Sequence, residues 1–581
     1  MIYFFISFII LASMFLPITK EELKKLGWKN LDIIFVTGDA YIDSPYIGVA
    51  LLGKLLVKNG FKVGIISQPD LKSSHDILRL GTPRLFWGVT AGSIDSMVAN
   101  YTPLKKRRKS DDFTPGGKNN RRPDRATIRY VNLIKQYDKT KKPIVIGGIE
   151  ASLRRIAHYD YWDDSIRRSI LFDSKADILV YGMGEKTILE LAKRFAKNDD
   201  YKDVRGICYI SKETIHDFTK LPSFEQVTTN KNHFIEMMKI FYENQDPVNA
   251  NGLIQQYDSR LLIHNPPQWL PNEKELDSYY ELDFEYDVHP YLKKQGEVKA
   301  IHTIKNSITI NRGCFGECNF CAIAVHQGTR VVSRSIPSII KEVERLKKTP
   351  YFKGIINDLG GPTANMYGYE CDKKQKFGKC KHKRCIFPDV CDKMTISHEK
   401  LITLMRKVRE IDGVKRVFIQ SGLRYDLILK DKLFGDKYLE ELIRYHISGQ
   451  LKIAPEHLEN DVLALMGKPS NKILGEFVKK FYAKNRELGK KQFLTYYIIV
   501  AHPGCSFANT KKLKNKLLST IRTIPEQIQI FTPLPLTWSS VMYYTEKDPF
   551  TGKKIYVEKN LKKKAQQKNY LLMNKQKSNQ R

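Results

Sequence analysis

The stretch Arg312–Cys321 reads RGCFGECNFC and comes one residue after the strand-like run SITI at residues 307–310. It holds three of the nine cysteines, Cys314, Cys318 and Cys321, in the spacing C-x3-C-x2-C. Thiolates select zinc or iron-sulfur clusters, and short spacings let one loop place several sulfurs around one centre. A closed structural zinc site takes four ligands, commonly as two separated pairs. Three ligands on a cluster of four irons leave one iron open, which implies chemistry at that iron.

The N-terminal half alternates short apolar runs with amphipathic stretches. Residues 31–41 predict a strand that ends in a polar turn, residues 47–61 a helix closed by Gly60, and residues 62–70 a second strand. Residues 84–92, 142–152 and 176–185 repeat the apolar run followed by glycine. This alternation predicts a parallel, Rossmann-like α/β sheet. Ligands of such sheets bind at the carboxyl ends of the strands, where the sequence places Gly38, Asp39, Gly147, Gly148, Glu150, Gly182 and Glu185.

Two segments interrupt this pattern. Residues 101–125 are basic and contain Gly and Pro, so we expect an exposed loop on which a polyanion could dock. Residues 231–298 lack a clear period and are interpreted as a connection. The predicted organisation is an apolar leader at 1–19, a Rossmann-like domain at 20–230, the connection at 231–298, a second α/β domain at 299–545 with a cysteine-rich insertion at 371–391, and a lysine-rich tail at 546–581.

Composition limits the classes of protein. A chain of 581 residues with 42% hydrophobic residues predicts two or three globular domains. The net charge of +34 suits a nucleic-acid or anionic-membrane partner, but the lysines are spread along the whole chain, so a compositional bias explains the charge equally well.

Compartment follows from the cysteines and the N-terminus. Nine clustered cysteines do not form a disulfide framework and favour a reducing compartment, here the cytoplasm. The apolar run at residues 1–17 lacks a basic n-region and is shorter than the roughly 20 residues of a comfortable span, so a membrane partner is not expected. A weak membrane anchor and an upstream extension of the true start remain open alternatives. Residues 1 to about 14 are expected to lie outside the folded core.

A second set of four cysteines lies in the insertion at 371–391, and His382 lies within the same segment. Four soft ligands in one polar segment could fold around a metal ion or cluster, because metal binding can order a segment without a core of its own. Zinc, an iron-sulfur cluster and free thiols remain the alternatives for these residues, which are Cys371, Cys380, Cys385 and Cys391.

The cysteine loop, with Phe320 before its last cysteine, resembles the signature loop of the radical S-adenosylmethionine (SAM) superfamily. The surrounding motifs narrow the resemblance to the YgiQ-type radical SAM proteins over about residues 15–557. These motifs are TGDAYIDSP (37–45), GGIEASLRR (147–155), YGMGE (181–185), NRGCFGECNFCAIAVHQGTRVVSRS (311–335), DLGGPTANMYG (358–368), IAPEH (453–457) and DPFTGK (548–553). The resemblance implies that the second domain is a radical SAM partial β/α barrel.

The resemblance to YgiQ-type proteins also implies the cofactors. Cys314, Cys318 and Cys321 would ligate a [4Fe-4S] cluster whose open iron chelates SAM, and an electron donor such as a flavodoxin or ferredoxin would reduce it. Phe320 belongs to the same loop and is carried over as a cofactor-binding residue. The residues Gly360, Gly361 and Pro362 match the turn whose backbone binds the SAM amino group, with proline where the superfamily has an acid.

Later strand ends supply further candidates. Ser421 and Arg424 follow one apolar strand and Glu456 follows another, which suits contacts to the ribose or the methionine carboxylate of SAM. The long apolar strand at residues 493–501 ends in His502, Pro503 and Gly504 and is expected to be the last strand of the partial barrel.

The predicted function is a radical SAM enzyme that cleaves SAM to a 5'-deoxyadenosyl radical and abstracts hydrogen from an unknown substrate. The alternatives are a radical SAM modifier of tRNA or rRNA, favoured by the basic segment at residues 105–108, and a non-catalytic iron-sulfur or zinc protein that binds nucleic acid. Cobalamin remains open only without a lower axial histidine, because the chain has no D-x-H-x-x-G loop. The substrate and the oligomeric state are not predicted.

Overall fold

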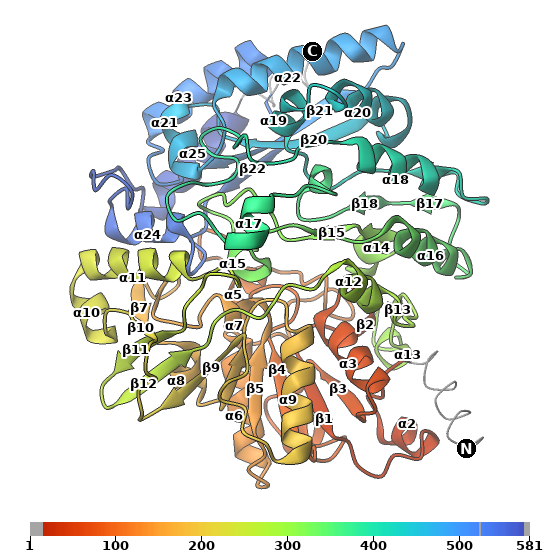
Figure 1. The fold of residues 1–581 in the computed structure, drawn as a ribbon, viewed down its shortest axis with the longest axis vertical. Coiled ribbons are helices and arrows are strands. Elements are labelled where there is room, and N and C mark those ends of the chain that lie inside the picture. Colours follow the sequence, from red (N-terminus) through yellow and green to blue (C-terminus); the bar gives the residue numbers. More distant parts are fainter. Residues whose placement is uncertain (1–14, 522–523, 574–581) are drawn as a thin grey trace. The chain divides into compact units, whose positions relative to one another are not determined.

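The computed structural model describes residues 15–521 and 524–573 (Figure 1). The contacts divide the chain into two units. The first holds the described residues as far as His158 together with Trp162–Lys305, and the second holds Tyr159–Tyr161 and the described residues from Asn306 onward. The prediction that residues 1 to about 14 stay outside the core falls on residues outside this description, and it stays a prediction.

The first unit is built on a nine-stranded sheet in the order β10-β11-β12-β9-β8-β5-β4-β1-β3. Strands β3, β1, β4, β5 and β8 pair in parallel, whereas β9, β12 and β11 are joined by antiparallel pairings. All side chains of β1 are buried, as expected for a parallel strand covered on both faces. The predicted Rossmann-like sheet is confirmed. The strands are β1 (Ile33–Thr37), β3 (Val63–Ser67), β4 (Phe86–Thr90), β5 (Ile144–Gly147), β8 (Ile178–Val180), β9 (Ile207–Ser211), β10 (Thr219–Lys220), β11 (Leu253–Tyr257) and β12 (Arg260–His264).

Helices cover this sheet through narrow apolar stripes. Helix α9 (Glu185–Lys197) buries Ile188, Leu191 and Ala192 and packs beside α3 (Gly48–Lys58) in front of the sheet in Figure 1. Helix α6 (Ala126–Tyr137) packs on β4, and α4 (Ser74–Ile77) and α8 (Ile170–Ser174) pack against α6. The shorter helices of this part are α2 (Lys20–Lys25), α5 (Ser96–Asn100) and α7 (Gly148–Ser152).

Residues 231–298, which the sequence suggests are a connection, are an integral part of the first unit. Strands β11 and β12 form a hairpin, and β12 pairs with β9 and extends the main sheet. The hairpin turns at Asp258, whose φ of +50° lies in the left-handed region that tight hairpin turns require. Strand β13 (Asp287–Val288) pairs with β2 (Ile42–Asp43). The helices of this segment are α11 (Lys231–Glu243), α12 (Glu273–Tyr280) and α13 (Pro290–Lys293).

The second unit is a curved series of parallel strands. β14 pairs with β18, the Leu359 N–H donates to the Phe418 carbonyl next to β19, a parallel bridge joins Leu423 to Ile453, and β20, β21 and β22 follow in order. The predicted partial β/α barrel is confirmed. The strands are β14 (Ser307–Thr309), β17 (Ile355–Ile356), β18 (Asp358–Gly360), β19 (Arg416–Val417), β20 (Gln450–Glu456), β21 (Phe493–Val500) and β22 (Gln527–Ile530).

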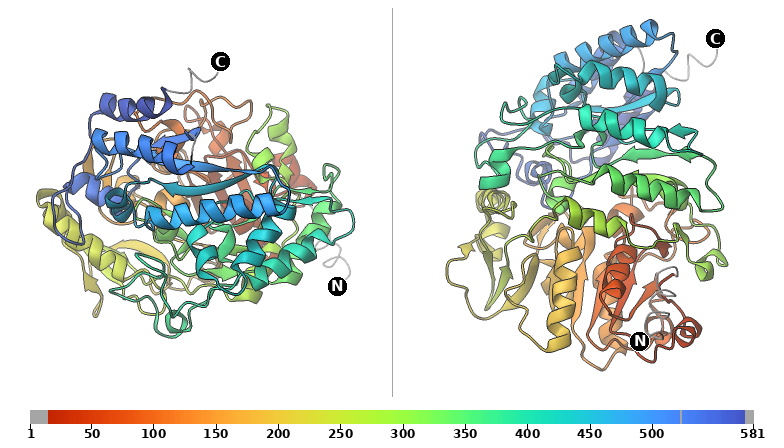
Figure 2. Two further views of the ribbon diagram at one scale, coloured as in Figure 1. Left: turned by 90° about the horizontal axis from the view of Figure 1, so that it is seen from above. Right: turned by 45° about the vertical axis from the view of Figure 1, so that its right-hand side comes forward.

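Helices follow the barrel strands in turn, in green to blue in Figure 2. They are α16 (Ile336–Lys347), α18 (Glu399–Arg409), α20 (Gly435–Glu441), α22 (Asn471–Glu487) and α23 (Phe507–Lys516). Along β20 and β21 buried side chains alternate with half-buried ones. Because successive side chains of a strand point to opposite faces, one face of this sheet is sealed and the other remains partly open. No helix of the described residues is long and apolar enough to cross a membrane.

The C-terminal segment predicted as a lysine-rich tail contains an ordered helix, α25 (Leu561–Leu572), which packs on α23 and β22. Lys564, Gln567 and Leu571 are buried, and the Gln567 amide oxygen accepts a hydrogen bond from the Ala501 N–H at 2.9 Å. This segment therefore closes the second unit as far as Leu572.

Candidate functional site

The three clustered cysteines lie on the loop between β15 (Asn311–Arg312) and α15 (Ile323–Gln327), past the carboxyl end of β14. At Gly316 the backbone N–H donates to Cys314 Sγ at 3.3 Å. A Cβ at this position would lie 3.1 Å from Cys314 Sγ and 3.6 Å from Cys318 Sγ. The loop therefore brings two sulfurs to one glycine, where a side chain would enter the space beside them.

Burial and the neighbouring thiols set the electrostatics of the loop. Burial raises the pKa of the Cys314 thiol and raises that of Cys321 to about 12, and the neighbouring Cys318 thiol adds to both shifts. Among the described residues no three His, Cys, Asp or Glu side chains are gathered tightly enough for a single metal ion. A four-iron cluster binds each thiolate to a different iron, so its ligands need not meet at one point. The donor set of three thiols therefore fits such a cluster.

Arg424 lies beside this loop rather than at a free strand end. Its guanidinium donates to Asp426 from Nε at 2.8 Å and from Nη2 at 2.5 Å, and Nη1 lies 3.9 Å from Cys318 Sγ. Burial lowers the pKa of the Arg424 guanidinium, but the Asp426 carboxylate outweighs it and the net shift is upward. Arg424 therefore stays cationic and can offset the charge of thiolates.

The turn at Gly360, Gly361 and Pro362 faces an unpaired amide that the sequence analysis missed. A Cβ at Gly361 would lie 2.7 Å from Asn311 Oδ1. Asn311 is fully buried, and neither its side-chain oxygen nor its nitrogen has a hydrogen-bond partner among the described residues. A buried amide without partners costs free energy, so Asn311 is a candidate contact for a ligand at this turn. Its position directly before the cysteine loop is the only sequence signal.

Ser421 is engaged with a second residue that sequence reasoning missed, Asp358. The Ser421 hydroxyl donates to the Asp358 carboxylate, and the backbone N–H groups of Gln420 and Ser421 donate to Asp358 Oδ1 at 2.8 and 3.1 Å. A Cβ at Gly360 would collide with the Ser421 hydroxyl. Asp358 thus fixes the end of one strand against the next. It also supplies a carboxylate near the turn where Pro362 stands in place of the superfamily's acidic residue.

Two strand ends carry strained backbone. Glu456, the last residue of β20, has φ +69°, and Ala501, just after β21, has φ +58°. Residues other than glycine adopt this region at a cost, and such positions cluster at functional sites. Burial raises the pKa of the Glu456 carboxyl, although Lys468 opposes the shift, and Glu456 in turn raises the pKa of Cys321. The interaction with Cys321 places Glu456 near the cysteine loop.

Phe320 packs toward the last barrel strands. Its ring meets His502 edge to face with the centroids 6.4 Å apart, and it packs against the buried Val462, Met466 and Cys505. His502 bonds the Pro503 carbonyl and the Ser539 hydroxyl, and burial lowers the pKa of His502 to about 3, so the ring is neutral. His502 has a structural role, and Phe320 anchors the cysteine loop.

The family follows from comparison with known proteins. The family model described as Radical SAM N-terminal matches residues 15–307. A UPF0313 protein of Fusobacterium nucleatum is 54% identical over 555 residues, which cover 95% of this chain and 98% of that protein. A UPF0313 protein of Thermotoga maritima is 48% identical over 565 residues, covering 97% and 99%. The chain belongs to the UPF0313 family of radical SAM proteins. The resemblance to YgiQ-type proteins seen in the sequence is confirmed.

Solved structures of radical SAM enzymes also align with this UPF0313 chain. The methyltransferase TsrM from Kitasatospora setae, solved with cobalamin and a [4Fe-4S] cluster, is 14% identical, with a TM-score of 0.49 over 88% of this chain and 74% of that one. The cobalamin-dependent enzyme OxsB, solved with aqua-cobalamin, is 13% identical, with a TM-score of 0.49 over 92% and 57%.

In this UPF0313 chain the carboxyl ends of β1 and β4 are filled by the chain's own side chains. Arg122 Nη1 lies 2.8 Å from Asp39 Oδ1 and donates to the Ala91 carbonyl at 2.6 Å, while Nε donates to Asp111 Oδ2 at 3.1 Å. Glu150 accepts from the Ser96 and Thr127 N–H groups. The loop at 101–125 is therefore only partly as predicted, because residues 106–109 are exposed but Asp111 and Arg122 are buried. Its second half seals the edge where a ligand was expected.

Proposed function

We propose that this chain is a radical SAM enzyme in which Cys314, Cys318 and Cys321 ligate a [4Fe-4S] cluster. The iron without a cysteine ligand would bind SAM. The observation that carries the proposal is that Cys314 and Cys318 bring their sulfurs together beside Gly316 at the carboxyl edge of a partly open parallel barrel. Sites at that edge are the rule for β/α barrels. A cluster bound there supplies the electron that cleaves SAM to methionine and a 5'-deoxyadenosyl radical, which abstracts hydrogen from the substrate.

The chain's own residues would bind and orient SAM. The backbone of Gly360, Gly361 and Pro362 suits the SAM amino group, and the unpaired Asn311 amide next to it can donate to or accept from the same ligand. Arg424, fixed by Asp426 beside Cys318, offsets the negative charge of the thiolates.

Other predicted SAM contacts have narrower roles. The Ser421 hydroxyl and backbone N–H both already donate to Asp358, so Ser421 would contribute through the shape of the strand end. Glu456, near Cys321 and in a strained conformation, is the remaining strand-end side chain for the ribose or for a reacting group. Phe320 supports the loop from the side of His502.

The test is anaerobic reconstitution of the full chain with iron and sulfide. The broad absorption of a [4Fe-4S] cluster should appear, the EPR signal of the reduced cluster should change when SAM is added, and a strong reductant should release 5'-deoxyadenosine slowly without substrate. Alanine at Cys314, Cys318 or Cys321 removes an iron ligand and should abolish both responses. A complete cluster that shows no response to SAM and forms no deoxyadenosine would replace this proposal with a non-catalytic iron-sulfur protein.

The substrate class is a separate question, and the exposed basic residues 106–109 favour RNA as one candidate. Phosphate contacts make binding fall with salt, and each lysine removed lowers the slope by about one. Salt-dependent tRNA binding that is lost on charge removal at residues 106–109 would support a modifier of tRNA or rRNA. Salt-independent or absent binding would leave a small molecule or a protein as substrate. We place the enzyme in the cytoplasm, where its thiols would stay reduced.

A further inference from the structure

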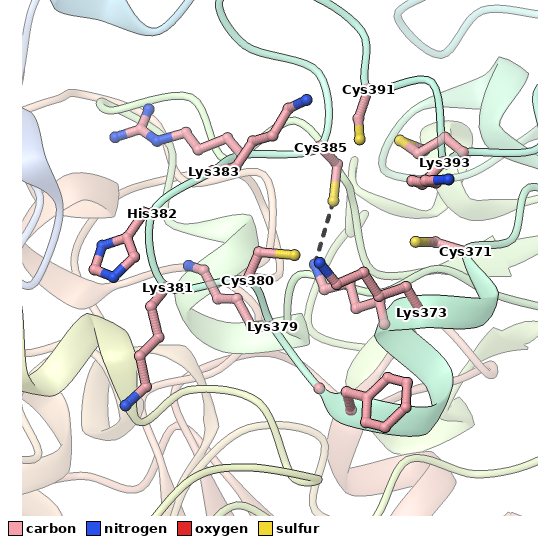
Figure 3. A pocket seen from close by; sticks show the side chains of 15 residues that line it. Cys371, Lys373, Lys379, Cys380, Lys381, His382, Lys383, Cys385, Cys391 and Lys393 are labelled. Carbon is pink, nitrogen blue, oxygen red and sulfur yellow. Dashed lines mark hydrogen bonds between the residues drawn. The ribbon is translucent and has the colours of Figure 1, made fainter.

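The cysteine-rich insertion of the second unit contains a cavity that the proposed chemistry does not use. Cys371, Cys380, Cys385 and Cys391 all line this cavity, whose volume is about 410 Å³. Figure 3 shows their sulfur atoms turned toward a common space, although the four residues come from different points of a 21-residue segment. His382, which the sequence places within the same set, is exposed and turned away from the sulfurs (Figure 3). The thiols therefore form a set of four without the histidine.

The backbone of the insertion is organised around these cysteines. The Cys391 N–H donates to the Cys385 carbonyl at 2.8 Å, and the Cys371 carbonyl accepts from Gln375 at 2.9 Å at the start of α17 (Asp372–Phe377). Cys371 belongs to a buried core with Ile386 and others, against which Cys385 and Cys391 pack. A core and backbone hydrogen bonds thus fix Cys371, Cys385 and Cys391, and Cys380 completes the set as a fourth thiol in the lining of the cavity.

Charge around the cavity matches an anionic cluster. The lining, all of it in the described part of the chain, contains no acidic residue but several cations, which are Lys373, Lys374, Lys379, Lys381, Lys383, Arg384 and Lys393. Lys374 is only 2% exposed, and its ammonium lies 3.6 Å from Cys385 Sγ and donates to the Thr329 carbonyl at 2.7 Å. A cluster core of charge +2 with four thiolates has a net charge of −2, so surrounding lysines stabilise it.

Geometry favours an iron-sulfur cluster over zinc. Structural zinc draws four ligands onto one tetrahedral centre and commonly takes pairs of closely spaced cysteines. Here the spacing is C-x8-C-x4-C-x5-C, and among the described residues no three potential ligands are close enough to share one ion. The sulfurs instead line a cavity that has room for a body larger than an ion.

We propose that Cys371, Cys380, Cys385 and Cys391 ligate a second [4Fe-4S] cluster. With four protein ligands it has no open iron, so it would carry one electron from a flavodoxin- or ferredoxin-type donor rather than bind SAM.

This electron-carrying role rests on the proposed function, whereas binding of the cluster does not. The position of the insertion supports the role. Glu317, between the cysteines of the first loop, lies 2.5 Å from Lys379 and 3.9 Å from Lys374, and the Lys374 ammonium lies 5.5 Å from the Phe315 ring centroid. The two cysteine sets therefore belong to one connected part of the second unit.

The test separates the two sites by mutation in the full chain, reconstituted anaerobically with ferrous iron and sulfide. The parent protein should bind about eight iron and eight sulfide atoms. The triple variant Cys314→Ala/Cys318→Ala/Cys321→Ala should keep about four of each and the absorption of a [4Fe-4S] cluster, without an EPR response to SAM. The double variant Cys380→Ala/Cys385→Ala should lose about half the iron and keep the response to SAM. Cys208→Ala, which removes a buried thiol from β9, is the matched control and should match the parent.

Each outcome decides the proposal. A folded triple variant without iron, or one that binds zinc without sulfide, overturns the second cluster. If the triple variant does not fold, as judged by circular dichroism, the double variant decides, and an iron content equal to that of the parent overturns the proposal. Failure of the first site would appear differently, as a parent protein that has the second cluster's iron but no response to SAM.

Discussion

Replacing Arg122 with leucine should destabilise the first unit strongly, because this arginine seals the carboxyl edge of the sheet. Its side chain is fully buried and pairs with Asp39 at 2.8 Å and with Asp111 at 3.1 Å, and both carboxylates are themselves at most 4% exposed. The Ala91 carbonyl would also lose its donor. Removing one partner of a buried ion pair leaves uncompensated charge and costs about 3–5 kcal/mol. We expect a loss of that size in the free energy of unfolding.

Urea unfolding followed by tryptophan fluorescence mainly reports the stability of the first unit. Four of the five tryptophans, at positions 28, 87, 162 and 269, lie in the first unit. Absorption of the reconstituted cluster, which depends on the second unit, should stay unchanged. The matched control is Arg107→Leu in the same loop, since Arg107 is about half exposed and lies 3.4 Å from Asp124. An exposed pair is worth less than about 1 kcal/mol.

A rescue variant isolates the charge effect. Arg122→Met combined with Asp39→Asn and Asp111→Asn leaves no buried charge unpaired, and neutral replacements of buried ion pairs are often tolerated. This variant should regain most of the stability lost in Arg122→Leu. The reasoning is refuted if Arg122→Leu costs no more than Arg107→Leu, because the network would then contribute nothing to closing this edge.

Three further predictions concern the second unit. Gly316→Ala should lower the iron content of the reconstituted protein, because the new Cβ would lie 3.1 Å from Cys314 Sγ. An unchanged iron content would show that the loop can shift to accommodate the methyl group. Asn311→Ala should weaken SAM binding about tenfold, measured by EPR titration, with full cluster content, since about 1.4 kcal/mol of hydrogen bonding is lost; equal affinity would remove Asn311 from the site. Burial alone would raise the pKa of Asp431. Hydrogen bonds, above all from His398, outweigh this effect and lower the pKa from 3.8 to about 2. That stability is present above pH 3.8 and lost as pH falls toward 2, so Asp431→Asn should cost about 2 kcal/mol at pH 7 and little at pH 2; a pH-independent cost would contradict this.

The sequence predicted the elements whose signal is local. The fully buried run Ile33–Thr37 appears as a continuous apolar stretch, and α3 (Gly48–Lys58) lies within the helix predicted over residues 47–61. The role of residues 231–298 was missed because pairing of β12 with β9 depends on contacts far apart in sequence. Arg122 was assigned to an exposed basic loop for the same reason, since its two carboxylate partners cannot be recognised from local charge.

In the candidate site, too, the sequence predicted only the residues that form a local pattern. The spacing of Cys314, Cys318 and Cys321 is a local pattern, so the sequence could place these thiols on one loop. The environment of the loop is assembled from separate strand ends. Asp358 bonds Ser421 across two strands, and the Asn311 amide faces a turn fifty residues away, and neither pairing leaves a periodic trace.

The carboxyl ends of the strands in the two units are filled in different ways. In the first unit the Arg122–Asp39 ion pair and the hydrogen bonds of Glu150 occupy the ends of β1 and β4, although the Ser67 hydroxyl and the Gln68 amide oxygen at the end of β3 have no partner among the described residues. In the second, Asn311 is buried without a partner among the described residues, Glu456 is strained, and one face of β20 and β21 stays half-exposed. Unpaired groups and strain cost stability, and they often mark functional sites. Together with the loop of Cys314, Cys318 and Cys321, they are the reason to expect cluster, SAM and substrate to meet in the second unit.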